Sequence, residues 1–558
     1  MLAGLRLALR AADTRVSSPP LRFKVEDALV TAVNLALRED QDSAAAVGKH
    51  ALVLTLTLTF ESLSERTQSL INYDHLLPGL LHTAFLSQEG LWEGYWLSTI
   101  DRDVAEVPGR KFAWSTKSPT YGLVQGIHSR PLIKSLGPLS RLIAHAVLRV
   151  SNPQTASLAL VQIVDFARTL SVSWRQNKLS EIDPLEESNF LDDEAVNQTL
   201  PALWSLLRLA LFACVIVLRA VLERALLDPG IAQSIEPPEL AKRCLSALRY
   251  LYFIASRLGH DSSSQYLFAI MAATDILSQY PDQTQRFLLE IRPPVHDQIP
   301  PHPADRCFDL FFLNAAESFT QVLPATFNEE VVLASAMPYL AINEDQSLIN
   351  ILEAAHSVAL SLFAHPQNAD VASRHIPFYL DTLFSCFPRS ISARQFKLAF
   401  RTMIRACSPP SPLAQSHPLL PSVLLEIVAE KAKYASSYPL PRPFQPASQQ
   451  VAEEEQTSEQ AALLLAIIDS LCFLHPDLLD EWLPLTAAMV SNVQNPTMQT
   501  LCREAFWEAI SSGIMDVERA ALCVAWWNSN DGREQLLFEQ APETRLEMSG
   551  ALPMDSKL

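Results

Sequence analysis

The chain has 558 residues, which at about 150 residues per domain leaves room for three or four domains or one long repeat array. Only 14 residues are glycine while 38 are proline, so Gly-rich nucleotide loops and turn-rich β folds, which need many residues at positive φ, are disfavoured. The net charge of −18 argues against nucleic acid as a partner. We therefore expect an all-α protein.

The N-terminal part of the chain reads as a tail followed by helices. Residues 1–20 are basic and amphipathic but lack the apolar core of a secretory signal, and we expect a tail there. An N-terminal helical region is expected over 21–178. Within it, residues 52–60 alternate between apolar residues and threonine as a strand would. Because no turn signal flanks them, we interpret them as a buried helix.

The charge distribution singles out residues 107–164, which contain no Asp or Glu across 58 positions. Glycine and tryptophan gather at 90–137, where we expect a basic loop segment. Basic residues beside aromatic ones could bind anionic lipid headgroups or an acidic partner. The candidate patch consists of Arg110, Lys111, Lys117, Arg130, Lys134, Trp92, Trp96 and Trp114. The alternative stays open that acidic helices elsewhere in the chain neutralise a basic loop over the core.

Two features follow this region. Seven acidic residues between positions 181 and 194 indicate an acidic linker at 179–198. The longest apolar run, 209–218, has ten residues and an arginine on each side, whereas a membrane span needs about 20 residues. We therefore expect a soluble intracellular protein without a membrane-spanning helix.

A helical repeat array is expected over 199–437. Apolar residues of 237–260 recur at steps of three and four, and a second helix would follow to Tyr280, so the two form a hairpin. An apolar–proline–x–apolar step recurs 39, 44 and 63 residues apart, at Pro338, Pro377, Pro421 and Pro484. Without the polar stretch 438–457 the last spacing is 43. We predict an irregular α-solenoid of HEAT/armadillo-like helical hairpins, with an irregular all-α protein as the alternative.

The C-terminal part is expected to contain a loop, helices and a tail that ends in a targeting signal. The Pro/Gln/Glu-rich stretch 438–457 should be an exposed loop that binds an SH3 domain or serves as a spacer. C-terminal helical repeats are expected at 458–540 and an extended tail at 541–558. The last three residues match the C-terminal peroxisomal targeting tripeptide, which a receptor would bind through the free carboxylate and these side chains: Ser556, Lys557 and Leu558.

No catalytic constellation emerges from the sequence. The patterns GxSxG, GxxxxGK[ST], GxGxxG and HExxH are absent, and the eight cysteines lie at least 21 positions apart, so no CxxC metal site exists. We expect buried, reduced thiols, no cofactor, no metal site and no enzymatic activity.

A glycine-poor helical scaffold that lacks catalytic motifs and ends in Ser556-Lys557-Leu558 resembles peroxin 8, the intraperoxisomal peroxin of fungi. The resemblance covers the architecture over most of the chain, the tripeptide and the preceding stretch 548–553. It implies a peripheral protein on the matrix side of the peroxisomal membrane. Such a protein would bind the import receptor, assist cargo release, and bridge the docking and RING-finger subcomplexes of matrix protein import. Two alternatives are a peroxisomal matrix enzyme without a recognisable motif and a cytosolic HEAT-type scaffold with a chance SKL end.

Overall fold

The computed structural model describes Gly4 and residues 19–38, 46–109, 111–228, 237–258, 264–294, 299–340, 342, 345–440, 457–529 and 532–537. Contacts within the chain divide it into two compact units. The first comprises Met1–Tyr339 with Ser347–Val358, and the second comprises Leu340–Gln346 with Ala359–Leu558.

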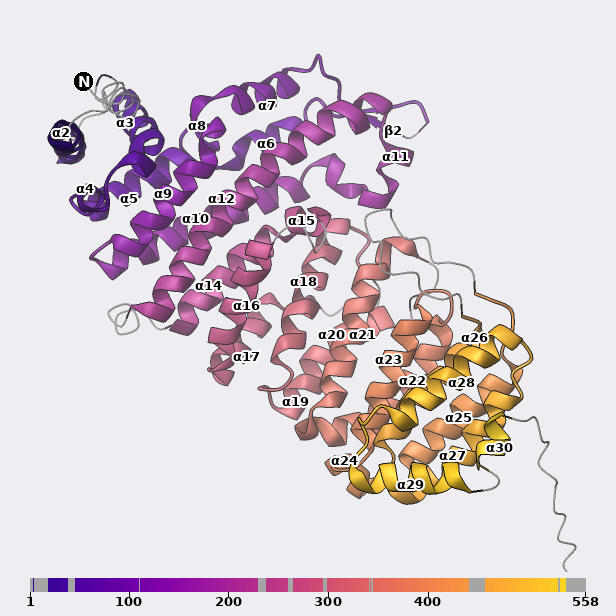
Figure 1. Ribbon diagram of the computed structural model, residues 1–558. Coiled ribbons are helices and arrows are strands. Elements are labelled where there is room, and N and C mark those ends of the chain that lie inside the picture. The colour runs from indigo at the N-terminus through magenta and orange to yellow at the C-terminus, as the bar shows by residue number, and fades with distance from the viewer. Residues whose placement is uncertain are drawn as a thin grey trace, which may run out of the picture. The chain divides into compact units, whose positions relative to one another are not determined.

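The described chain is almost entirely helical, and the all-α prediction is confirmed (Figure 1). The longer helices of the first unit are α2 (Pro19–Arg38), α3 (Ala46–Thr59), α5 (Tyr73–Leu81), α7 (Pro119–Ser129), α9 (Leu136–Arg149), α10 (Pro153–Arg175), α12 (Leu200–Leu227), α14 (Pro237–Tyr250), α16 (Ser264–Ser278), α17 (Pro281–Ile291) and α18 (Pro303–Phe319). Its shorter elements include α4 (Glu65–Gln68), α6 (Tyr95–Ile100), α8 (Pro131–Lys134), α11 (Glu187–Phe190), α15 (Tyr252–Ala255), α19 (Ala325–Phe327) and the paired strands β1 (Ala105–Val107) and β2 (Lys111–Ala113).

The division between the units falls at α20 (Ala334–Leu340) and α21 (Ile349–Ala364). The second unit contains α22 (Ala369–Cys386), α23 (Ala393–Cys407), α24 (Pro412–Ser416), α25 (Leu420–Tyr434), α26 (Glu459–Ser470), α27 (Pro476–Ser491), α28 (Pro496–Ser511), α29 (Val517–Asn528) and α30 (Gly532–Leu537). In both units, helices pack mainly on others close to them in the chain, as in an irregular α-solenoid.

Helix α12 is the centre of the first unit's core. It packs against α9 and α16, while α14 packs against α10 and α16 (Figure 1). The predicted hairpin of 237–280 is therefore present as α14 and α16, with the short α15 between them. The helix expected at 52–60 is also present, as α3 with one 3₁₀ turn after it. Its threonines suit a helix because Thr57 and Thr59 donate to the carbonyls of the residues four positions earlier, at 2.7 and 2.8 Å.

The expectation that no helix is long and apolar enough to span a membrane is wrong. Three helical stretches meet that criterion by length and composition, namely Pro153–Arg175, Ala195–Leu227 and Gln346–Ala364. Arg208 and Arg219 interrupt the second stretch in sequence, but they are 11 residues apart and lie on one exposed face of α12. In its most apolar window, 67% of the residues are buried by packing within the fold.

The recurring prolines lie within helices. Pro338, Pro377 and Pro484 are inside α20, α22 and α27, and Pro421 is in the first turn of α25. A proline inside a helix removes one backbone hydrogen bond, and a π-helical turn at Asn328–Leu333 precedes the first of them. The prolines therefore mark helix interiors more often than the ends of repeats.

The acidic segment 179–198 lies inside the first unit instead of separating two units. Leu191 and Ala195 are buried, and Leu191 forms a β-bridge with Phe112. Its carboxylates pair with arginines of later helices, Asp183 with Arg306 at 3.1 Å and Glu187 with Arg257. The segment expected to be a loop at 90–137 is mostly helical, with α6, α7, α8 and the start of α9. The other predicted boundaries stay predictions, and the residues of the 438–457 loop from 441 to 456 lie outside the described residues.

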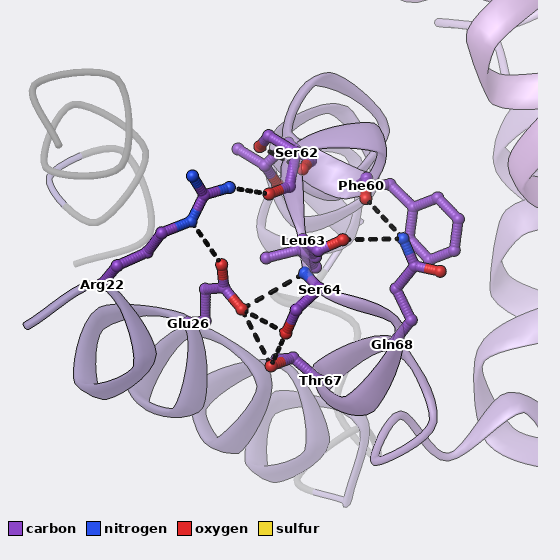
Figure 2. Close-up of polar contacts among 9 residues, drawn as sticks. Arg22, Glu26, Phe60, Ser62, Leu63, Ser64, Thr67 and Gln68 are labelled. Atoms are coloured by element: carbon purple, nitrogen blue, oxygen red, sulfur yellow. Dashed lines mark hydrogen bonds and ion pairs between the residues drawn. The ribbon is translucent and has the colours of Figure 1, made fainter. Parts of the chain in front are cut away.

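A buried carboxylate joins the first helices of the chain. Figure 2 shows Glu26 of α2 between Arg22 on its own helix and the turn that begins α4. Glu26 is fully buried and accepts from Arg22 Nε at 3.0 Å, Ser64 Oγ at 2.7 Å, the Ser64 amide at 3.2 Å and Thr67 Oγ1 at 2.9 Å. Arg22 also donates to the Ser62 carbonyl at 2.7 Å. A charged group held by this many donors fixes α2 to α4.

Candidate interaction surfaces

The predicted surface patch of the basic segment lacks most of its aromatic part. Trp96 and Trp114 are completely buried. The Trp96 indole donates to the Leu91 carbonyl at 3.1 Å, and the Trp114 indole donates to Thr120 Oγ1 at 3.0 Å. Placing these two residues on a surface was therefore wrong, because their rings belong to the core and their N–H groups are satisfied there. Trp92 is half-buried.

The turn that holds Trp92 has an unusual backbone. Trp92, Glu93 and Gly94 have φ values of +50°, +51° and +78°. Gly94 also lies against the core, since a Cβ atom there would sit 2.6 Å from Leu170 Cδ2. A positive φ is costly for the two residues that are not glycine, Trp92 and Glu93, so packing around this turn must hold it. Sequence reasoning noted the glycines here but did not predict this turn.

The basic residues of the patch have different roles. Arg130 Nη1 donates to the carbonyls of Gln88 and Gly90, so it anchors the preceding turn. Lys111 is half-buried, with its Nζ 3.5 Å from the Ser188 carbonyl. Lys117 and Lys134 are exposed, while Arg110 lies outside the described residues. Only these two lysines are thus free to form a positive surface among the described members of the patch.

The acid-free segment is compensated in space by acids from elsewhere in the chain. Glu194 of the acidic segment accepts hydrogen bonds from the Thr116 hydroxyl and, at 2.9 Å, from the Thr116 amide. These bonds hold the pKa of Glu194 below its ordinary value. Arg141 pairs with Glu61 at 2.8 Å. The contacts favour the interpretation in which acids from other parts of the chain neutralise the basic segment.

A second surface was missed by sequence reasoning. It lies on α28, α29 and their connection and consists of exposed apolar side chains together with the half-buried Trp527; we call it the α29 surface, and its members are Trp507, Ile514, Val517, Ala521, Val524 and Trp527. The rings of Trp507 and Trp527 lie 4.8 Å apart, which joins the two helices. The opposite side of α29 carries buried Cys523. The steps of four and three from Val517 to Val524 could have indicated one helix face, but not which face the core covers.

The cysteines and the candidate metal ligands of the described residues can be surveyed together. All eight cysteines are unpaired, and six of them are buried, as the sequence predicts. Burial raises the pKa of Cys407 and Cys502 to about 12, which keeps these thiols protonated near neutral pH. No group of three or more His, Cys, Asp or Glu side chains that could hold a metal ion is found among the described residues. The predicted targeting residues Ser556, Lys557 and Leu558 lie outside the described residues.

Four domain models from one protein family match successive parts of the chain. They are the Peroxin 8 protein-like N-terminal domain at residues 1–68, the PEX8 helical domain at 117–261, the PEX8 central TPR-like domain at 284–364 and the PEX8 C-terminal domain at 370–536.

Curated relatives carry related names. The Peroxisomal membrane protein PEX17 of Yarrowia lipolytica is 27% identical over 331 residues, which are 53% of this chain and 47% of that protein. The Peroxisomal biogenesis factor 8 of Komagataella phaffii is 22% identical over 457 residues, with coverages of 73% and 61%. That of Pichia angusta is 21% identical over 348 residues, with coverages of 60% and 52%. The matched stretches thus span 47% to 61% of the relatives' lengths.

Solved structures similar to the chain include helical repeat proteins. The crystal structure of Kap121p matches 90% of this chain and 49% of its own length, at 13% identity and a TM-score of 0.30. A circular tandem repeat protein matches 94% of this chain and 95% of its own, at 13% identity and a TM-score of 0.24. At these TM-scores the fold assignment rests on the helices of the chain itself.

Proposed function

Because this chain belongs to the peroxin 8 family of peroxisome biogenesis factors, we propose that it is a non-catalytic scaffold of matrix protein import. In this proposal it lies peripherally on the matrix side of the peroxisomal membrane. There it binds the import receptor, assists cargo release and bridges the docking and RING-finger subcomplexes.

The observation that carries the proposal is the succession of family matches along the chain. The four matched stretches begin at residue 1 and end at residue 536, so the similarity extends through both units. A single shared module could have been combined with an unrelated function, whereas matches in this order support a shared role for the whole chain.

The helical architecture supports a scaffold. A row of packed helices exposes many separate faces, which suits simultaneous binding of several partners. The buried thiols are poor nucleophiles because burial keeps them protonated.

The burial of the apolar helices supports peripheral attachment. The stretch Ala195–Leu227 is long enough to cross a bilayer, but 67% of its most apolar window is already covered by protein. Inserting it would require the first unit to lose the packing of α12 against α9 and α16. The tripeptide Ser556-Lys557-Leu558 supports entry through the import receptor itself.

The proposal is tested by deleting the gene for the chain in its host and following a fluorescent reporter that ends in SKL. We expect the reporter to remain in the cytosol in the deletion strain and to return to peroxisomes when the full chain is restored. Peroxisomal membrane proteins should still reach the membrane remnants, since only matrix import is affected. A reporter that stays peroxisomal in the deletion strain would refute an import function.

A further inference from the structure

We propose that the α29 surface is a docking site for a basic amphipathic helix of a partner protein. This inference deepens the proposed scaffold function, on which it rests, by naming one binding surface and the chemistry of what binds there.

The α29 surface is apolar and exposed among the residues that the structure describes. Val517, Ile514 and Val524 are 88%, 67% and 59% exposed, and Trp507 is 50% exposed. Isolated exposed apolar residues are ordinary, but here Val517 and Val524 share one face of α29, and the rings of Trp507 and Trp527 adjoin each other between α28 and α29. Tryptophan is among the residues that contribute most to binding energy at protein interfaces.

The shape of the surface fits a helix. Val517, Ala521 and Val524 form a ridge on the exposed side of α29, which at 1.5 Å per residue is roughly 10 Å long. Such ridges pack between the side chains of a second helix that repeats at three and four residues. A β-strand has no edge to extend here, because residues 496–529 contain no strand.

The charge around the surface selects a basic partner. Helices α28 and α29 and their connection carry four acidic residues and two arginines. One of the two arginines, Arg519, forms an ion pair with one of the four acids, Asp516, and also donates to the Leu474 carbonyl at 2.6 Å. The other three acids are exposed and form no ion pair within the part of the chain that the structure describes: Glu504, Glu508 and Glu518.

Glu504, Glu508 and Glu518, which we call the acidic rim, disfavour binding of a membrane or of a second copy of this chain to the α29 surface. An anionic membrane would be repelled by exposed carboxylates that flank the apolar ridge. A second copy of the chain would use the same patch on both subunits, so the acidic rims would face one another. A helix with lysine or arginine beside its apolar face meets both the ridge and the rim.

The test is photo-crosslinking of the full chain in its host. p-Benzoyl-phenylalanine is introduced in place of Val524 on the surface, and in place of the exposed Asp381 of α22 as a control. Peroxisomes are irradiated intact, and the crosslinked peptides are sequenced by mass spectrometry. We expect position 524 to capture a peptide of another protein with apolar residues at helical spacing and a positive net charge.

Charge reversal provides the second arm of the test. E508K/E518K changes two exposed rim residues and should reduce the crosslink from position 524 about tenfold, since like charges then oppose the partner. The matched variant D381K/E426K changes two exposed acids elsewhere in the second unit and should leave the crosslink unchanged.

Several outcomes would overturn the inference: a crosslink to lipid, to a second copy of this chain or to an acidic peptide, or none above the Asp381 control. An unchanged crosslink in E508K/E518K would do the same. The import reporter separates this failure from that of the scaffold function. If import still requires the chain but position 524 captures nothing, the docking site fails alone. If import does not require the chain, the scaffold function fails whatever position 524 captures.

Discussion

Replacing Glu26 with glutamine should loosen α2 from the rest of the first unit. The glutamine keeps the shape of the side chain but has one acceptor oxygen and an NH₂ group in place of the carboxylate. Because Oε2 of Glu26 accepts from the Ser64 amide, Ser64 Oγ and Thr67 Oγ1, and Oε1 accepts from Arg22, the amide cannot satisfy all four donors.

The expected loss of stability depends on which of the four donors can find another hydrogen-bond partner in E26Q. The hydroxyls of Ser64 and Thr67 can rotate, and the Arg22 side chain is 42% exposed and can regain water. The Ser64 amide has neither option, since it is fixed in the backbone. Removing one member of a fully buried ion pair costs about 3–5 kcal/mol, so with these recoveries we expect about 2–3 kcal/mol for E26Q. This corresponds to a roughly 30- to 150-fold larger opening equilibrium.

Hydrogen exchange of the full chain, read by mass spectrometry, is the suitable assay because a two-unit protein has no single unfolding free energy. Peptides covering α2 and α4 should exchange faster in E26Q by that factor. The control is E61Q, which breaks the pair between Glu61 and Arg141, whose side chains are 70% and 57% exposed. Such surface pairs contribute at most about 1 kcal/mol. Equal exchange in E26Q and E61Q would refute the reasoning.

The hydrogen bonds to Glu26 also make the difference in stability between E26Q and the unaltered chain depend on pH. Burial raises the pKa of Glu26, but hydrogen bonds from Ser64, Arg22 and Thr67 outweigh it and leave the pKa below its ordinary value. A carboxyl whose pKa is lower in the folded state stabilises that state fully above its unfolded pKa of about 4.3 and loses this as the pH falls through the folded pKa. The difference between E26Q and the unaltered chain should be constant from pH 6 to 8 and shrink below about pH 4. A difference that titrates near neutral pH would contradict the assignment to Glu26.

Three further predictions concern other parts of the chain. G94A should destabilise the region around α6 by about 1–3 kcal/mol because the residue has φ +78° and its new Cβ would meet Leu170. G122A, in open space within α7, should instead stabilise its helix by about 0.5–1 kcal/mol, and equal losses of exchange protection in both variants would contradict this. Removing Leu558 from a fluorescent fusion should leave the protein in the cytosol, and peroxisomal residence without it would exclude the tripeptide as the sole address. K117E/K134E should leave sedimentation with anionic vesicles unchanged because acids from other parts of the chain neutralise the basic segment, and reduced sedimentation would instead identify that segment as a lipid contact.

The sequence was sufficient for local structure where helical spacing is long and uninterrupted. The α14–α16 hairpin followed from apolar residues at steps of three and four. Helix α3 was predicted because no turn signal flanks the segment, although its residues alternate as in a strand. Its threonines are compatible with a helix because their hydroxyls donate to backbone carbonyls of the same helix. The scarcity of glycine and the absence of Gly-rich nucleotide-binding motifs were enough to predict the all-α fold class.

What the sequence did not reveal is which separated segments meet. The acid-free and acidic segments looked like a basic patch and a linker, but they pack together through contacts such as Glu194 with Thr116, nearly 80 residues apart. Trp96 and Trp114 are residues of a type common at interfaces, but both are buried in the core. The ridge at Val517 and Val524 has the opposite character, since it repeats like a core face yet is exposed. Periodicity identifies a face that needs cover, but only tertiary structure shows whether the same chain covers it.

The central claim is that this member of the peroxin 8 family connects the parts of the import machinery. It is tested most directly by crosslinking intact peroxisomes and purifying the full chain under denaturing conditions. The account predicts that the import receptor and members of both the docking and the RING-finger subcomplexes are recovered with it, and at lower yield without the chemical crosslinker. Recovery of the chain without the receptor and without either subcomplex would contradict the account.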